Sequence, residues 1–139
     1  MSRRYVLDAN ALVGLFEDRE GVAGKVETLL QEAARQDSAI LMSAVNWGEV
    51  FYIVWKRHGE ARAKEAEMNL QQMPIAVLEA DQFRASAAAT IKQKHDLSYA
   101  DAFAAELAME LGAWLVTADP EFAKLGKMLS VYKLPSHQK

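Results

Sequence analysis

Short runs of apolar residues alternate with longer stretches that repeat at helical spacing along nearly the whole chain. Such runs are typical of buried strands, and the longer stretches are typical of helices. The pattern predicts strands at 4–7, 39–42, 74–78, 114–116 and 128–131. It predicts helices at 10–16, 22–35, 43–58, 60–72, 80–94, 98–112 and 120–125. Together these predict an α/β fold, with a central parallel sheet of about five strands and helices on both faces.

The length of 139 residues predicts a single domain, which we expect to span 1–134 and to leave 135–139 as a short C-terminal tail. The chain has no cysteine, which excludes disulfides and thiolate metal sites and is typical of the reducing cytoplasm. The most apolar stretch, 40–55, contains Asn46 and Glu49. It is shorter than the ~20 residues that span a bilayer. We therefore expect a cytoplasmic protein that has no membrane partner.

Four acidic residues stand where this topology would bring them together. Asp8 and Asp119 lie just past the ends of the first and fourth predicted strands. Glu49 lies about two turns into the helix after the second strand, and Asp101 lies in the first turn of the helix before the fourth. Because sites in parallel α/β sheets form at the carboxyl ends of the strands, we expect all four carboxylates at one edge.

Each of three acids also has a purely structural interpretation. Ser98 and Asp101 have the spacing of a capping box, and Asp119 before a proline suits a helix N-cap. Asp8 could be an ordinary turn residue beside Asn10, which we expect to cap the first helix. From these residues alone, both interpretations stay open.

Glu49 is harder to explain by structure alone, because it is the only charged residue between positions 38 and 55. A helix that is apolar nearly all round is expected to be buried. A carboxylate buried there needs a metal, a hydrogen-bond network or a cation such as a distant Arg or Lys. Asn46, one turn earlier, can hydrogen-bond Glu49 or a neighbouring water molecule.

Four carboxylates crowded together would raise one another's pKa values, and a divalent cation would remove that repulsion. Mg²⁺ or Mn²⁺ suits a site made only of oxygen ligands. The three histidines, His58, His95 and His137, are scattered and are not at metal-ligand spacing, which disfavours zinc.

Four segments resemble the motifs of the PIN-domain nucleases, and among these the VapC-like toxins of type II toxin–antitoxin pairs. The segments are Tyr5-Val6-Leu7-Asp8-Ala9-Asn10, Ser43 through Glu49, Leu97-Ser98-Tyr99-Ala100-Asp101-Ala102 and Leu115-Val116-Thr117-Ala118-Asp119. The resemblance covers nearly the whole chain and implies a PIN-like domain that hydrolyses RNA phosphodiester bonds with Mg²⁺ or Mn²⁺.

The resemblance also implies a role for each site residue. Asp8 and Asp101 would hold the main metal, Glu49 would position or deprotonate the attacking water, and Asp119 would help a second metal. The small polar residues that support the site in the family match Asn10, Ser98 and Thr117.

The implied partners are RNA, a second copy of the chain and a cognate antitoxin protein. The apolar helix segment 51–55 has more apolar surface than one sheet face would cover, so a homodimer or an antitoxin could bury the rest. A net charge of −3 implies that RNA is held locally rather than by overall charge. Basic residues that could guide RNA, or could equally lie on solvated helix faces, are Lys56, Arg57, Arg62, Lys92, Lys94 and Lys124. The aromatic residues Trp47 and Tyr99 could stack on bases, or could belong to the core or an interface.

Other functions stay open at this point. A phosphatase with an aspartyl nucleophile would need an acid two residues after Asp8, where Asn10 stands, and a lysine after a strand end. A PIN nuclease that processes RNA outside a toxin system, or that cleaves DNA, would use the same acids. A non-catalytic PIN-like binding or assembly module is the third alternative.

Overall fold

The computed structural model describes residues 3–136, which form one five-stranded sheet in the order β3-β2-β1-β4-β5. All neighbouring strands are parallel, and Tyr5 of β1 pairs with both Ile40 and Trp114. The strands are β1 (Arg3–Leu7), β2 (Ser38–Ser43), β3 (Ala76–Leu78), β4 (Trp114–Thr117) and β5 (Val131–Lys133). The predicted α/β fold with a central parallel sheet is confirmed.

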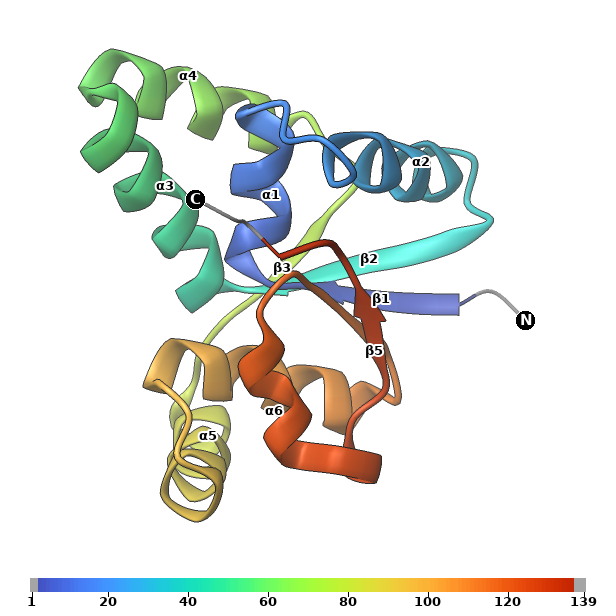
Figure 1. Cartoon of the computed structure of the whole chain (residues 1–139), viewed down its shortest axis with the longest axis vertical. Coiled ribbons are helices and arrows are strands. Elements are labelled where there is room, and N and C mark those ends of the chain that lie inside the picture. The colour runs from blue at the N-terminus through green and yellow to red at the C-terminus, as the bar shows by residue number, and fades with distance from the viewer. Residues whose placement is uncertain (1–2, 137–139) are drawn as a thin grey trace.

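Helices cover both faces of the sheet, as predicted (Figure 1). One face carries α1 (Ala9–Phe16), α2 (Ala23–Ala34), α3 (Ala44–His58) and α4 (Glu60–Gln71). The other face carries α5 (Gln82–His95), α6 (Tyr99–Leu111) and the 3₁₀ helix η1 (Pro120–Met128). Each layer encloses its own apolar cluster, with Leu7 and Met42 in the first and Val6 and Leu115 in the second.

Local sequence signals explain why the helices begin and end where they do. The Ser43 hydroxyl accepts a hydrogen bond from the Val45 amide at 3.2 Å and caps α3. Gly59 ends α3 at a φ of 93°, and Gly112 ends α6 at a φ of 61°. Residues with a Cβ rarely adopt these angles, so glycine stops both helices at defined points.

Three sequence predictions need correction. The fifth strand lies at Val131–Lys133 and not at 128–131, because η1 continues to Met128 through a kink at Gly126, whose φ is 55°. Asp8 caps α1 instead of Asn10, whose amide instead contacts the end of β4. The third strand is confined to Ala76–Leu78 and excludes Pro74, which has no amide hydrogen for a sheet ladder.

Helix α3 is less buried than its composition suggests. Only Asn46, Val50 and Val54 are fully buried in it, on the stripe that faces the rest of the domain. On the opposite side, Tyr52 and Trp55 are 57% and 43% exposed. The helix is therefore buried along one stripe, because a single sheet face covers only that side.

No helix within residues 3–136 is long and apolar enough to span a membrane. At the C-terminus, the Ser136 hydroxyl donates to the Ala118 carbonyl at 3.2 Å, so residue 136 contacts the domain. The division of the chain into 1–134 and a tail remains a prediction. Residues 137–139, which include His137, lie outside the described part of the chain.

A buried ion pair in the second layer yields a stability prediction. Burial raises the pKa of the Glu106 carboxyl, and the Arg84 guanidinium, 3.0 Å from it, partly offsets this. We expect Arg84→Met to lower the free energy of unfolding by roughly 2–3 kcal/mol, because it leaves Glu106 buried without its cation. Urea unfolding measures the change.

The matched control is Arg62→Met, whose partner Glu65 is 3.7 Å away in an exposed pair. It should change stability by less than about 0.5 kcal/mol. Equal effects of the two substitutions would contradict the importance of the buried pair.

Candidate active site

Asp8 follows β1 directly and is 3% exposed. One carboxylate oxygen, Oδ1, accepts from the Ala9 amide at 2.9 Å and thereby caps α1. The other, Oδ2, accepts from the Thr117 hydroxyl at 2.8 Å. Asp8 therefore joins the ends of the two neighbouring central strands β1 and β4 at the carboxyl edge of the sheet.

Asn10 and Thr117 extend this connection toward Asp119. The Thr117 hydroxyl oxygen accepts from the Asp119 amide at 3.0 Å and from the Asn10 side-chain amide at 3.3 Å. The Asn10 side-chain oxygen accepts from the Ala118 amide at 3.1 Å. These contacts fix the backbone of residues 117–119 against the start of α1 and hold Asp119 at the same edge as Asp8.

Glu49 is half-buried and is oriented by Asn46, which is fully buried. The Asn46 amide nitrogen donates to Glu49 Oε1 at 2.9 Å and to the Ala100 carbonyl at 3.1 Å. It therefore ties α3 to the first turn of α6, next to Asp101. Asn46 Oδ1 is buried and has no hydrogen-bond partner within residues 3–136, so a water molecule would satisfy it.

The capping interpretations are also correct for Ser98 and Asp119. The Ser98 hydroxyl accepts from the Asp101 amide at 3.1 Å, and Asp119 Oδ1 accepts from the Glu121 amide at 2.9 Å. The cap at Asp119 uses one carboxylate oxygen. Asp101 donates its backbone amide to the Ser98 hydroxyl, and the Ser98 side chain also interacts with the Asp101 carboxyl and opposes the rise of its pKa. Capping therefore leaves carboxylate oxygens of both residues available to a ligand.

Electrostatics show that the four carboxylates lie close together. Burial, followed by the charges of Asp101 and Glu49, raises the pKa of Asp8 from 3.8 to about 7, although the Thr117 hydrogen bond opposes this. Burial, followed by the charge of Asp119 and more weakly by that of Glu49, raises the pKa of Asp101 from 3.8 to about 6. The structure thus brings together the four acids that the sequence singled out.

The donor set fits a hard divalent cation. Within residues 3–136, no three Asp, Glu, His or Cys side chains converge closely enough to enclose an ion by themselves. Mg²⁺ does not need such a cage, because it usually keeps several waters and takes one or two carboxylates. The carboxyl pair Asp8 and Asp101, with the Glu49 carboxylate acting on both, suits a partly hydrated ion of this kind.

Two side chains beside the acids were not singled out by the sequence. Burial and then the neighbouring Glu49 carboxylate raise the pKa of Tyr52, which places its hydroxyl beside Glu49. The spacing of three residues on one helix was the available signal. Arg19 lines a pocket together with Asn10 and Asp119, and nothing in its local sequence indicates this.

Three of the other candidates for RNA contacts are engaged elsewhere. Lys92 donates to the Leu97 carbonyl at 3.2 Å and Lys124 to the Asp96 carbonyl at 2.9 Å. Tyr99 is partly exposed, but its ring packs on Phe103 with 4.9 Å between centroids. Of the predicted cations, only Arg57 lines the same pocket as Asp119.

Comparison with known proteins identifies the family. The PIN domain family model matches residues 5–128, and the chain therefore belongs to the PIN domain family. No curated protein matches its sequence significantly.

Solved structures with the same fold include toxins of toxin–antitoxin pairs. VapBC2 from Rickettsia felis, bound to a promoter DNA fragment, has 18% identity and a TM-score of 0.69, covering 94% of this chain and 98% of that one. VapC20 from Mycobacterium tuberculosis, a sarcin–ricin loop cleaving toxin, has 17% identity and a TM-score of 0.72, covering 88% and 95%. A toxin–antitoxin complex from Klebsiella pneumoniae has 20% identity and a TM-score of 0.67, covering 93% and 98%.

The raised pKa of Asp8 predicts that this carboxyl destabilises the metal-free protein at neutral pH. Below about pH 4 it is protonated in both the folded and the unfolded chain and contributes little. As the pH rises from about 4 to 7, the unfolded chain loses the proton first, so the stability of the folded state falls. Asp8→Asn should therefore gain stability on the order of 1–3 kcal/mol at pH 7 and almost none at pH 4.

Urea unfolding in EDTA at several pH values measures this difference. Asp37→Asn is the control, because Asp37 is exposed and pairs with Arg35 away from the acids. It should show no gain that grows with pH. An Asp8→Asn variant that is less stable than the wild type at every pH would contradict the prediction.

Proposed function

We propose that this protein is a Mg²⁺- or Mn²⁺-dependent endoribonuclease that hydrolyses RNA phosphodiester bonds. The observation that carries this proposal is the buried Asp8 carboxyl, held beside Asp101 with both pKa values raised. Such an arrangement is unfavourable in an empty protein and favourable around a cation. Membership of the PIN domain family supports nuclease activity in particular.

In this mechanism Asp8 and Asp101 would hold the ion, and Asp119 would help to hold a second one. When bound there, it would supply Lewis acidity toward the phosphate and positive charge to stabilise the transition state. Glu49, fixed by Asn46, orients the attacking water and accepts its proton as the new phosphorus–oxygen bond forms. The ribose oxygen on the opposite side of the phosphorus leaves with its bonding electrons and takes up a proton from water.

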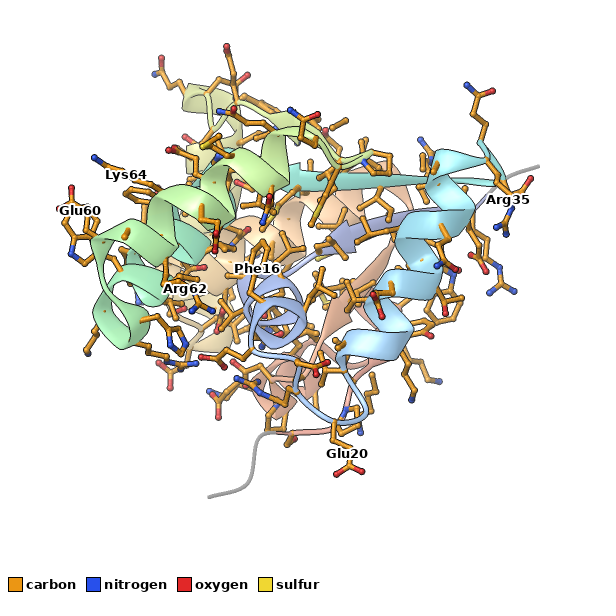
Figure 2. The ribbon with its side chains drawn as sticks, turned by 90° about the horizontal axis from the view of Figure 1, so that it is seen from above. Phe16, Glu20, Arg35, Glu60, Arg62 and Lys64 are labelled. Atoms are coloured by element: carbon orange, nitrogen blue, oxygen red, sulfur yellow. The ribbon has the colours of Figure 1, made fainter. Side chains whose placement is uncertain are left out.

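We further propose that the protein is the toxin of a toxin–antitoxin pair, active in the cytoplasm and inhibited by a cognate antitoxin. Support comes from the folds of the solved toxin–antitoxin complexes. A pocket of about 480 Å³ between α1 and the α3–α4 hairpin offers room for a partner segment. Figure 2 shows Phe16 on the side of α1 that faces the hairpin and Arg62 on the hairpin itself; both residues line this pocket.

A homodimer is proposed on the exposed side of α3. Tyr52 and Trp55 lie on that side and leave apolar surface that a second copy would cover.

An antitoxin arginine that reached the four acids would neutralise them and compete with the ion. A small upstream gene for a DNA-binding partner would support the toxin assignment.

The deciding experiment incubates the purified protein with structured RNA, single-stranded DNA or a phosphate monoester, each with Mg²⁺, Mn²⁺ or EDTA. We expect RNA cleavage only with metal. Asp8→Asn and Asp101→Asn should each lower kcat/KM by on the order of 100-fold or more, since even residues behind metal ligands contribute about 10–100-fold. Asp37→Asn removes the same charge from an exposed site and should leave kcat/KM unchanged.

RNA cleavage that persists in EDTA, or that survives both substitutions, would overturn the mechanism. Cleavage of DNA alone would reassign the protein to DNA, and cleavage of the monoester alone would make it a phosphatase. Metal-stabilised protein that cleaves none of the three would favour a binding or assembly module.

A further inference from the structure

A second, smaller pocket adjoins the acidic site and has a different character. It encloses about 230 Å³. Asn10 and Asp119 form the wall that it shares with the acidic site, and Arg19 and Arg57 also line it. The apolar side chains of Val13, Ile53 and Ala118 complete the lining. The pocket therefore places two guanidinium groups beside one of the four candidate carboxylates.

Both arginines are held in place by the same residue, Glu17. Arg19 Nη2 lies 2.7 Å from Glu17 Oε1, and Arg57 Nη1 lies 3.2 Å from both carboxylate oxygens of Glu17. His58 Nε2 lies 2.9 Å from Glu17 Oε2. Burial alone would raise the pKa of Glu17, but hydrogen bonds from His58, Arg19 and Arg57 outweigh it and lower the pKa to about 2. Glu17 is thus charged at all physiological pH values and fixes both guanidiniums.

Glu17 uses only part of the donor capacity of these arginines. Each guanidinium carries five N–H donors. One Arg19 nitrogen and one Arg57 nitrogen contact Glu17, and the other nitrogens of both have no hydrogen-bonded protein acceptor within residues 3–136. The Arg19 side chain is only 15% exposed and that of Arg57 is 48% exposed. The remaining donors of the partly buried Arg19 are not among the buried atoms without a partner, so they are open to water or to a bound anion.

We propose that Arg19 and Arg57 bind a backbone phosphate of the RNA strand, next to the phosphate that is cleaved. This inference rests on the proposed ribonuclease function. A planar guanidinium matches two phosphate oxygens at once, and two arginines held at fixed positions lose little side-chain entropy when a phosphate binds. A strand crossing the acidic site carries a phosphate at every nucleotide, so its neighbouring phosphate meets this pocket.

A phosphate fits the pocket better than a carboxylate from a protein partner does. The pocket continues from Asn10 and Asp119, so an occupant that already lies on the four acids extends into it. The Glu17 cluster also has a structural role, because it ties the end of α1 to the end of α3. That role needs the donors that face Glu17, whereas phosphate binding needs the donors that do not.

The test compares Arg57→Gln with Arg35→Gln in RNA cleavage. Arg35 is an exposed arginine that pairs with Asp37 at 3.2 Å, and Figure 2 shows it at the far end of α2. We expect Arg57→Gln to raise KM for RNA about 5- to 20-fold while kcat changes less than about 3-fold, as loss of one charge-assisted phosphate contact predicts. Its log kcat/KM should depend less steeply on log salt, by about 0.7, the contribution of one single-strand phosphate. Arg35→Gln should change neither KM nor the salt dependence of kcat/KM.

A substrate series locates the contact. RNAs with one uncharged methylphosphonate linkage, moved along the strand, should show a single position beside the cleaved bond that raises KM for the wild type. In Arg57→Gln a methylphosphonate at that position should no longer raise KM. Arg57→Lys keeps the charge without the planar fork and should be intermediate, and it serves in place of Arg57→Gln if the latter does not fold.

Equal KM and salt dependence in Arg57→Gln and Arg35→Gln would overturn the proposal. So would an Arg57→Gln variant that binds RNA normally but loses binding to a hexaglutamate peptide, which would assign the arginines to a protein partner. If the wild type cleaves no RNA with either metal, the ribonuclease function fails separately. The phosphate site is then decided by fluorescence anisotropy with the same RNA in EDTA, where Arg57-dependent binding supports it and equal binding rejects it.

Discussion

Repulsion among four carboxylates at one edge of a parallel sheet is the constraint to which the rest of the site is fitted. The parallel topology creates this edge, because every strand ends there and the helices α1, α3, α6 and η1 begin there or close to it. Helix starts carry unpaired amide hydrogens and the positive end of the helix dipole, both of which favour negative charge. The Asp8 carboxylate takes one amide from α1 and the Thr117 hydroxyl from β4. These contacts reduce the repulsion without removing it, as the raised pKa values of Asp8 and Asp101 show.

Structural and functional interpretations of the acids therefore describe the same atoms. A carboxylate has two oxygens, and a cap needs only one of them. Asp119 caps η1 with Oδ1, and Asp101 offers its backbone amide to Ser98, whose side chain also interacts with the Asp101 carboxyl. Capping fixes where each carboxyl stands, which is the positioning that an ion site needs before any ion binds.

The sequence predicted the fold, and it predicted which acids meet, because strand and helix patterns determine the topology and the topology determines the edge. It could not predict finer features that depend on side-chain contacts across the chain. The kink at Gly126 moves the last strand to Val131–Lys133, and a single glycine does not indicate the angle it adopts. Asn46 was expected to reach Glu49, one turn away, but its bond to the Ala100 carbonyl joins residues 54 positions apart. Arg19 beside Asp119 depends in the same way on how the turn after α1 folds back.

The distribution of charge explains how a chain with a net charge of −3 can act on a polyanion. Free lysines on solvated helix faces attract RNA over a long range but do not orient it, and salt screens them. Arg19 and Arg57 are different, because Glu17 holds them in fixed positions at the rim of the acidic site. A cation between the carboxylates would turn this acidic edge into a binding site for one phosphate, and the two arginines would hold a second. Binding through two adjacent contacts needs only a short stretch of RNA, so an overall acidic surface can coexist with cleavage at a defined position.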